Sequence, residues 1–428
     1  IGYDTRLDSE NFADAVAEVS TANDIVTFLC DKASTTPAVA YNVVARDAGA
    51  GVVITASHNP ACWNGFKYKP HYGGSASAEI VERLEEYIAL AETSNETKFM
   101  PLPNAQANGM LEYIDPEPTY LSHIATMVDL ESIRKAGLRI VVDPMFGAGA
   151  GYFTKLLSGG STEITEIRSN RNPTFPGMSQ PEPIAQNLEL LMETVPAGSF
   201  HVGLATDGDA DRLGLVDENG QFLTTLQSFA LLCLYQLEVL GRRGPLVRSI
   251  TMTRMIDRLG AIYDVPVFDT PVGFKHLGPV MMREDALIAG EESGGYAFRG
   301  SIPERDGVLS GLMLLDMMVR TDKSPSELLV MLEDKVGQHF YDRWDLEFNP
   351  KHRESVQERI SSAFPSNFAG FHVDEIDTRD GYRFILKGGN WVLIRFSGTE
   401  PLLRIYAEAD SKDEVDDLLT EAQALVGI

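Results

Sequence analysis

The chain has 428 residues, of which 44% are hydrophobic and 23% are charged, so it is long enough for about three or four globular domains. Its formal net charge of −26 argues against nucleic acid and anionic membrane surfaces as partners. The longest apolar stretches are too short and too polar to cross a bilayer, and three widely spaced cysteines predict neither a disulfide framework nor a zinc site. A reducing cytosol is therefore the expected compartment.

The chain opens with IGYDTR, which reads as part of a strand, and it starts at Ile1 without a signal-peptide pattern. We expect that some N-terminal sequence is missing. The strand pattern AGVVITASHNP, residues 50–60, is apolar and ends in a short polar loop that begins at Ser57 and His58. No partners for a serine-hydrolase triad stand out, and taken alone the SHNP sequence suits the turn that starts a helix equally well.

Strands alternate with helical patterns through most of the chain, which is typical of layered α/β domains. A strand, a glycine-rich turn and a helix follow one another over residues 138–157, and a strand, an acidic loop and a second strand occupy 201–216. Residues 286–295, ALIAGEESGG, again place a polar loop after an apolar strand, and residues 79–92 have a helical pattern. In open α/β sheets such loops lie beyond the carboxyl ends of the strands, where ligands bind.

The last part of the chain has a different pattern. Apolar and polar residues alternate over residues 373–410, with turns at RDG and KGGN, and helical segments flank this region near 352–364 and 411–426. This pattern predicts an antiparallel α+β domain. The domain boundaries that we predict from these changes give four domains, at residues 1–104, 105–220, 221–325 and 326–428.

The loop TDGDADR follows a strand and carries Asp207, Asp209 and Asp211 at alternate positions. In an extended turn such residues can converge on one point, and three carboxylates without histidine or cysteine suit a hard cation such as Mg²⁺. A solvated acidic turn is the plain alternative. An EF-hand is disfavoured, because Arg212 stands where that loop needs glycine and apolar strands replace its helices. An aspartyl-phosphate phosphatase would usually have Thr or Val in place of Asp211.

The acidic loop suggests why Ser57 stands at the end of an apolar strand. A serine hydroxyl is a weak nucleophile without a base, but a phosphoserine beside Mg²⁺ is a good phosphoryl donor. Three carboxylates and a phosphoserine would together bind one divalent cation, with Ser57 supplying a phosphoryl oxygen as the fourth ligand. His58, and Lys67 in WNGFKYK, are candidates to hold that phosphate or to move protons.

Three further loops offer groups for a phosphorylated sugar. Glu291 and Ser293 in GEESGG supply a carboxylate and a hydroxyl, which vicinal sugar hydroxyls need as partners, although a helix N-cap is an equal alternative. RFSGTEP, residues 395–401, combines a guanidinium with hydroxyls and loop N–H groups, which suits a phosphate-binding nest and also a plain β-turn. Lys275 in TPVGFKH is either a phosphate contact or a surface lysine.

The pieces TASHNP, DGDADR, GEESGG and RFSGTEP, in this order and at domain spacing, resemble the motifs of the α-D-phosphohexomutase superfamily, which includes phosphoglucomutases and phosphomannomutases. The resemblance covers nearly the whole chain. It implies an α/β fold with three similar mixed-sheet α/β domains around a cleft plus a C-terminal α+β lid domain. Members usually carry an N-terminal strand and a short basic segment before the GYDTR-like piece, and this chain lacks them.

The resemblance also implies a role for each motif. The residues implied to act in catalysis are Ser57, His58, Lys67 and Arg212. The residues implied to hold Mg²⁺ are Asp207, Asp209, Asp211 and, through its phosphoryl group, Ser57. The residues implied to contact the substrate are Lys275, Glu291, Ser293, Arg395, Ser397, Gly398 and Thr399.

The implied activity is a Mg²⁺-dependent interconversion of hexose 1-phosphate and hexose 6-phosphate, with glucose 1,6-bisphosphate as intermediate and activator. The GEESGG loop resembles the glucose and mannose branches, and a phosphoglucosamine mutase is the alternative within the family. A sugar phosphatase and a non-catalytic sugar-phosphate-binding relative are the alternatives of other classes. The expected partners are hexose phosphates, with no nucleic acid and no membrane, and we expect a cytoplasmic monomer or weak homodimer.

Overall fold

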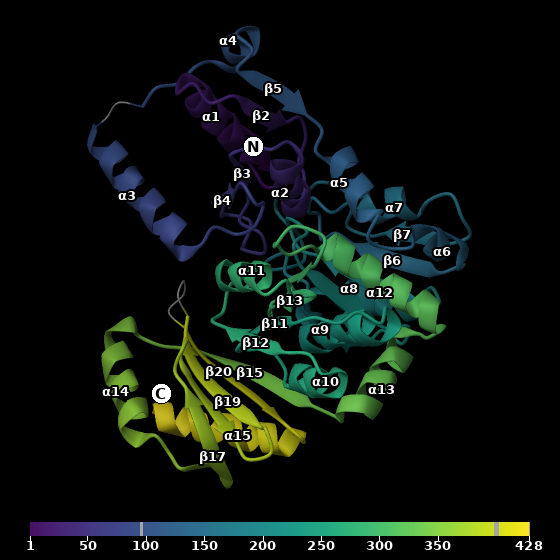
Figure 1. Cartoon of the computed structure of the whole chain (residues 1–428), viewed down its shortest axis with the longest axis vertical. Coiled ribbons are helices and arrows are strands. Elements are labelled where there is room, and N and C mark those ends of the chain that lie inside the picture. The colour runs from purple at the N-terminus through teal and green to yellow at the C-terminus, as the bar shows by residue number, and fades with distance from the viewer. Residues whose placement is uncertain (95–96, 398–401, 428) are drawn as a thin grey trace.

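The computed structural model describes residues 1–94, 97–397 and 402–427. Four units follow one another along the chain, from the purple N-terminal unit at the top of Figure 1 to the yellow C-terminal unit at the bottom. The first three units contain mixed sheets with helices, and the fourth contains an antiparallel sheet with helices. The predicted fold class is therefore confirmed, whereas the exact domain boundaries stay a prediction.

The first unit is organised by β1 (Gly2–Tyr3), which pairs in parallel with β3 (Ala50–Ile54). β3 pairs antiparallel with β4 (Phe66–Pro70). Backbone hydrogen bonds also connect the start of β1 with β2 (Thr27–Cys30), which pairs in parallel with β5 (Leu111–Ile114). The helices of this region are α1 (Ser9–Ala22), α2 (Thr36–Ala45), α3 (Ala78–Ser94) and α4 (Leu102–Ala107).

The second unit contains a five-stranded mixed sheet in the order β10-β9-β8-β6-β7. Its strands are β6 (Arg139–Asp143), β7 (Glu163–Glu166), β8 (Val202–Thr206), β9 (Leu213–Val216) and β10 (Phe222–Leu223). Its helices are α5 (Glu117–Ile124), α6 (Leu130–Lys135), α7 (Tyr152–Leu157), the 3₁₀ turn η1 (Ala185–Asn187) and α8 (Glu189–Ala197). The predicted acidic loop connects β8 and β9, which pair antiparallel, so the strands that disfavoured an EF-hand are present.

The third unit contains a four-stranded sheet in the order β12-β11-β13-β14. Its strands are β11 (Leu246–Ser249), β12 (Val267–Thr270), β13 (Ile288–Gly290) and β14 (Tyr296–Phe298). Its helices are α9 (Thr225–Leu234), continued by the π-helical segment η2 (Tyr235–Val239), and α10 (Met255–Tyr263), α11 (Phe274–Arg283), α12 (Gly307–Thr321) and α13 (Pro325–Val336). The GEESGG loop connects β13 with β14, which turn back on each other as an antiparallel pair.

The fourth unit contains a six-stranded sheet in the order β15-β20-β19-β18-β17-β16. Its strands are β15 (Phe340–Glu347), β16 (Asn367–Phe368), β17 (Phe371–Asp377), β18 (Tyr382–Leu386), β19 (Trp391–Phe396) and β20 (Leu402–Ala409). Its helices are the 3₁₀ turn η3 (Pro350–His352), α14 (Arg353–Ala363) and α15 (Lys412–Val426). The turns predicted at RDG and KGGN join β17 to β18 and β18 to β19, as the alternating pattern indicated.

Capping boxes explain where two of these helices begin. Ser324 accepts a hydrogen bond from the backbone of Glu327, whose side chain accepts one from the backbone of Ser324. Ser411 and Glu414 form the same reciprocal pair at the start of α15. Each box satisfies two backbone N–H groups that the first helical turn would leave without partners.

The buried apolar residues form one large cluster in the second and third units and a separate cluster in the fourth. Phe153 of α7, Leu204 of β8 and Leu312 of α12 are fully buried in one cluster that joins the second unit to the third. The fourth unit has a separate core, in which Ile394 of β19 packs with Leu419 of α15. The second and third units therefore share one core, whereas the fourth has its own core and a small cluster in which Trp391 and Leu393 pack with Ile250 of the third. No helix within the described ranges is both long and apolar enough to cross a membrane.

Polar contacts around the buried carboxylate of Glu408, on β20, join the fourth unit to the third. The carboxylate accepts hydrogen bonds from the Thr253 hydroxyl, the backbone N–H of Arg254 (2.9 Å) and the indole N–H of Trp391 (2.7 Å), and it lies 3.1 Å from Nδ1 of His339. Burial raises the pKa of Glu408, but the hydrogen bonds from His339 and Thr253 outweigh burial and lower it. Glu408 is therefore a charged anchor between the two units.

Replacing Glu408 with alanine should destabilise the protein by about 3–5 kcal/mol, because the buried donors around it would lose their acceptor. Thermal unfolding followed by circular dichroism measures this change. Glu358→Ala, on the exposed side of α14, is the matched control and should change stability by less than about 0.5 kcal/mol. Equal melting temperatures for the two variants would contradict the anchoring role.

Candidate active site

The acidic loop between β8 and β9 gathers three buried carboxylates. Asp207, Asp209 and Asp211 each offer a ligand atom, and these atoms lie within 4.8 Å of one another. Asp207 Oδ1 also accepts hydrogen bonds from the backbone N–H groups of Asp211 (2.9 Å) and Arg212 (3.1 Å), which hold the turn in shape. Within the described residues, buried Oδ1 atoms of Asp209 and Asp211 lack a hydrogen-bond partner. Two unpartnered carboxylate oxygens in a buried all-oxygen cluster fit a cation such as Mg²⁺.

The charges in this loop act on one another. Burial raises the pKa of Asp207 well above its usual range, and the charges of Asp211 and Asp209 add to that effect. Burial would also raise the pKa of Asp209, but the ammonium of Lys67 outweighs burial and holds that pKa well below its usual range. The loop is therefore an electronegative site whose charge depends on neighbouring cations.

Ser57 lies beside this loop although 150 residues separate it from Asp207. The Ser57 hydroxyl donates a 2.7 Å hydrogen bond to Asp207 Oδ2, and the Ser57 backbone N–H donates to Thr55 Oγ1 at 2.8 Å. Ser57 has a positive φ of 50°, which few non-glycine residues adopt. A Cβ at Gly208 would lie 2.5 Å from the Ser57 carbonyl oxygen, so glycine lets the two loops approach this closely.

Arg6, which we did not predict from the sequence, holds the serine loop. Its buried guanidinium donates hydrogen bonds to the carbonyl oxygens of Ser57 (2.6 Å), Asn59 (2.6 Å), Pro60 (2.9 Å) and Trp63 (3.1 Å). One arginine thus occupies the carbonyl groups along this turn and directs the serine hydroxyl toward the acidic loop. The sequence signal was the charged pair in GYDTR, which lies next to an apolar strand.

Lys67 and His58 lie at the same site in different protonation states. The Lys67 ammonium is 2.7 Å from Asp209 Oδ2 and 3.3 Å from Asp211 Oδ2. Burial opposes its charge, but these two carboxylates outweigh burial and raise the pKa of Lys67. Burial, followed by the charges of Arg212 and Lys67, lowers the pKa of His58 to about 2, so its ring is neutral at ordinary pH.

Arg212 lies directly after the acidic loop. Its terminal nitrogen pairs with Glu182 at 2.8 Å, and its Nε lies 3.9 Å from carboxylate oxygens of both Asp207 and Asp211. Glu182 therefore fixes the guanidinium within reach of the carboxylates. The structure brings Ser57, His58, Lys67, Arg212 and the three aspartates together, and their roles stay a prediction.

The GEESGG loop is next to the acidic loop. Glu291 Oε1 accepts hydrogen bonds from the Ser293 hydroxyl and from Arg305, each at 3.0 Å. Arg305 also contacts Asp211 Oδ2 at 2.7 Å, and the carbonyl of Gly294 accepts a hydrogen bond from the N–H of Leu213, at 3.0 Å. Glu291 and Ser293 thus lie beside the metal loop. Arg305 was missed, because its sequence, PERDG, reads as the polar start of a helix.

The candidate phosphate residues of the fourth unit lie at its interface with the third. Nε of Arg395, on β19, is 3.0 Å from Asp380 Oδ2, which also accepts a 2.9 Å hydrogen bond from the N–H of Val272. Val272 belongs to the loop that leads to Lys275, an exposed residue in the first turn of α11. Ser397 is buried at the end of β19. Gly398 and Thr399 lie outside the described residues.

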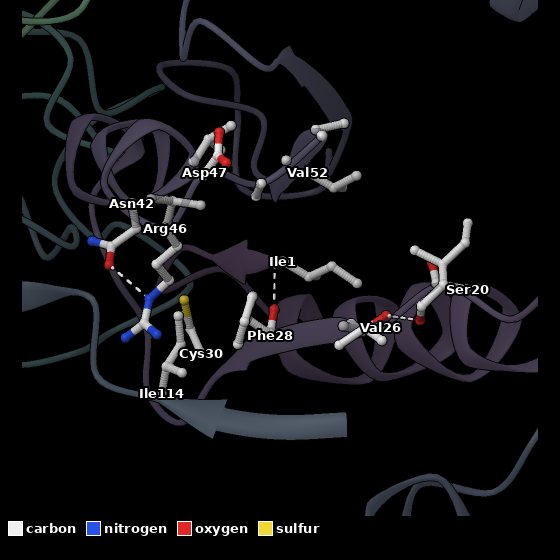
Figure 2. Close-up of a pocket in the computed structure, with 18 of the residues that line it drawn as sticks. Ile1, Ser20, Val26, Phe28, Cys30, Asn42, Arg46, Asp47, Val52 and Ile114 are labelled. Atoms are coloured by element: carbon white, nitrogen blue, oxygen red, sulfur yellow. Dashed lines mark hydrogen bonds between the residues drawn. The ribbon is translucent and has the colours of Figure 1, made fainter. Parts of the chain in front are cut away.

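A cavity of about 530 Å³ in the first unit lies away from this chemistry (Figure 2). It is lined mostly by hydrocarbon from β2, β3, α2 and the residues next to them, including Val26, Phe28 and Val52, with Arg46 at one side. None of the candidate site residues lines it. The polar groups that could perform chemistry are therefore gathered at the junction of the first three units.

Comparison with protein-family models gives four matches in chain order. They are described as phosphoglucomutase/phosphomannomutase alpha/beta/alpha domain I over residues 1–95, domain II over 118–220, domain III over 227–335 and C-terminal domain over 353–424.

Curated proteins and solved structures agree with these matches. A "Phosphoglucomutase/phosphomannomutase" of Thermococcus kodakarensis is 31% identical over 98% of this chain and 87% of its own length. A "Probable phosphoglucosamine mutase" of Methanopyrus kandleri is 31% identical over 98% of this chain and 88% of its own. The crystal structure of a candidate phosphomannomutase from Thermus thermophilus is 31% identical, covers 99% of this chain and 89% of its own, and superposes with a TM-score of 0.84.

Because all four domain models match and the relatives align over nearly the whole chain, the chain belongs to the α-D-phosphohexomutase superfamily, in the phosphoglucomutase/phosphomannomutase family.

Proposed function

We propose that this member of the phosphohexomutase family is a Mg²⁺-dependent enzyme that interconverts the 1-phosphate and 6-phosphate of glucose, and also of mannose. The observation that supports this proposal most strongly is the Ser57 hydroxyl, 2.7 Å from Asp207 and surrounded by buried carboxylates and cations. A serine held this way is ready to carry a phosphoryl group beside a metal ion.

In the proposed reaction, phosphorylated Ser57 gives its phosphoryl group to the free hydroxyl of a hexose monophosphate. A bond forms between phosphorus and the sugar oxygen while the bond between phosphorus and Ser57 Oγ breaks, and the sugar hydroxyl loses its proton to a base. The product is a hexose 1,6-bisphosphate, which turns over and returns its other phosphate to Ser57. Between the two transfers Ser57 has an unmodified hydroxyl, and the hydroxyl in this state donates the hydrogen bond to Asp207 that the structure shows.

The residues around Ser57 have distinct proposed roles. Asp207, Asp209 and Asp211 would hold Mg²⁺, which would screen the phosphate charge and stabilise the transferring group. Lys67 is protonated and therefore suits holding the phosphate rather than accepting a proton. His58 is neutral, so it can hydrogen-bond to the sugar hydroxyl or to the phosphate, but its lowered pKa makes it a weak proton acceptor.

A second phosphate site explains how one enzyme can use both ends of the sugar. We assign the phosphate that does not react to Arg395 and Ser397, together with the glycine and threonine that follow in RFSGTEP. Asp380 connects Arg395 to the loop that carries Lys275, which supports a joint contribution of the third and fourth units. Glu291 and Ser293 would accept hydrogen bonds from the sugar hydroxyls in either orientation.

We also propose that hexose phosphates are the partners of this chain, with no nucleic acid and no membrane, and that it acts as a monomer or weak homodimer in the cytoplasm. The net charge of −26 disfavours polyanions, and the cysteines among the described residues are free. A reducing compartment is compatible with free thiols.

Turnover assays with three sugars test the proposal. Glucose 1-phosphate, mannose 1-phosphate and glucosamine 1-phosphate are each supplied with Mg²⁺ and a trace of the matching 1,6-bisphosphate. We expect bisphosphate-dependent formation of the 6-phosphate from glucose and mannose. A strong preference for glucosamine 1-phosphate would instead favour the activity named for the Methanopyrus kandleri relative. Release of inorganic phosphate without an isomer would show a phosphatase.

Ser57→Ala should lose mutase turnover by at least about 1,000-fold, because alanine cannot carry the phosphoryl group. Intact-mass measurement of the wild-type protein after incubation with the bisphosphate should show a gain of about 80 Da, the mass of one phosphoryl group, and the variant should show none. Ser122→Ala, at an exposed position of α5, is the control and should behave as wild type. Retained turnover in Ser57→Ala would contradict the scheme.

Asp209→Asn should weaken Mg²⁺ binding by about 10- to 100-fold, because it removes one anionic ligand from the cluster. The concentration of Mg²⁺ that gives half-maximal turnover measures the effect, and an excess of EDTA should abolish turnover of the wild-type protein. Glu193→Gln, an exposed residue on α8 of the same unit, controls for the change in net charge. An unchanged Mg²⁺ requirement in Asp209→Asn would place the cation elsewhere.

A further inference from the structure

Arg305 stands between β14 and α12, where the first three units meet. Its guanidinium contacts two carboxylates that belong to different loops: Asp211 Oδ2 at 2.7 Å and Glu291 Oε1 at 3.0 Å. Asp211 belongs to the metal loop, residues 206–212, and Glu291 belongs to the sugar loop, residues 290–295. One planar cation therefore bridges the two loops, with a separate amino group directed at each.

The surroundings of Arg305 hold its side chain in this position. A Cβ at Gly295 would lie 2.2 Å from the Cδ of Arg305, so the absence of a side chain in the last glycine of GEESGG makes room for the arginine stem. The guanidinium carbon lies 5.7 Å from the centre of the Phe274 ring. Nε of Arg305 is 3.4 Å from Glu304, whose carboxylate also binds Lys69 of the first unit. The space at Gly295, the Phe274 ring and the Glu304 carboxylate thus hold the Arg305 guanidinium in position.

We propose that Arg305 is a positioning residue that fixes the metal loop and the sugar loop relative to each other, so that a sugar hydroxyl held by Glu291 is aligned with the phosphoryl group of Ser57. This inference rests on the proposed mutase function. Alignment of two reacting groups to within about 1 Å is worth on the order of 100-fold in rate, so a fixed bridge has a catalytic effect without touching the reacting atoms.

Arg305 contributes both a positive charge and a forked guanidinium, and different substitutions remove the two separately. Its positive charge competes with a cation for Asp211, because it lies 2.7 Å from a carboxylate oxygen of that residue. Its fork directs a separate amino group at each carboxylate, whereas lysine offers one ammonium without two donors at a fixed planar spacing. Removing the positive charge at position 305 should therefore raise the affinity of the metal loop for a cation. Removing the forked guanidinium should lower turnover, even where the charge is kept.

Arg305→Met and Arg305→Lys test this separation. In Arg305→Met, we expect Mn²⁺, titrated by electron paramagnetic resonance, to bind about tenfold more tightly, because a competing charge is gone. The same variant should bind glucose 1,6-bisphosphate about tenfold more weakly by calorimetry, with kcat about 100-fold lower. Arg305→Lys keeps the charge, so its Mn²⁺ affinity should stay within about twofold of wild type while kcat falls about tenfold.

The matched control is Arg283→Met, which removes an exposed arginine of α11 that pairs with Glu284. It should leave Mn²⁺ affinity, bisphosphate affinity and kcat unchanged. Bisphosphate affinity and kcat within threefold of wild type in Arg305→Met would overturn the proposal. If Arg305→Met does not fold, wild-type kcat in Arg305→Lys would overturn it, and a reduced kcat with unchanged Mn²⁺ affinity would support it.

Failure of the proposed mutase function gives a different result. In that case the wild-type protein would bind Mn²⁺ but turn over none of the three hexose 1-phosphates. The two binding measurements then still decide the role of Arg305, because tighter Mn²⁺ binding together with weaker bisphosphate binding in Arg305→Met supports a bridge between the loops. Shifts of both affinities in the same direction would overturn it.

Discussion

The arrangement of this molecule depends on the need to compensate three carboxylates buried in one short loop. Burying charge without compensation is costly, so each carboxylate needs a cation or hydrogen-bond donors close by. The cations come from three different parts of the chain: Lys67 from the first unit, Arg212 from the second and Arg305 from the third. The charge of one loop thereby connects three sheets that share no strand, and it places the serine, the metal loop and the sugar loop beside one another.

Close backbone approach completes the site. The Ser57 carbonyl can lie against the acidic loop because Gly208 has no side chain, and Arg6 then uses the carbonyl groups of the serine loop as acceptors. The loop is thus held by backbone contacts, so the serine hydroxyl can change its chemical state without being needed for the fold. A site that is fixed before the substrate arrives loses little energy to reorganisation during the reaction.

The sequence predicts the fold class and the positions of the serine and acidic loops, because short stretches of residues carry these signals. Ser57 and the aspartates follow apolar strands, and loops at strand ends are where α/β proteins place functional groups. The alternation in residues 373–410 predicted the antiparallel sheet of the fourth unit. Arg6 and Arg305 were not predicted, since Arg6 binds a turn that lies 51 to 57 residues further along the chain and Arg305 reaches the acidic loop of another unit. The core shared by the second and third units was also hidden, because periodicity shows which face is buried but not what covers it.

The separate core of the fourth unit has a consequence for how such an enzyme can change over generations. Most of its apolar residues pack among themselves, and its link to the third unit consists of polar contacts around Glu408 and Asp380 and a small apolar cluster of Ile250 with Trp391, Leu393 and Tyr406. Substitutions within this separate core, away from the contact with the third unit, therefore need no compensating change in the packing that supports the serine and the acidic loop. The core of the unit proposed to hold the phosphate that does not react can diversify by itself, while the part proposed to transfer the phosphoryl group stays as it is.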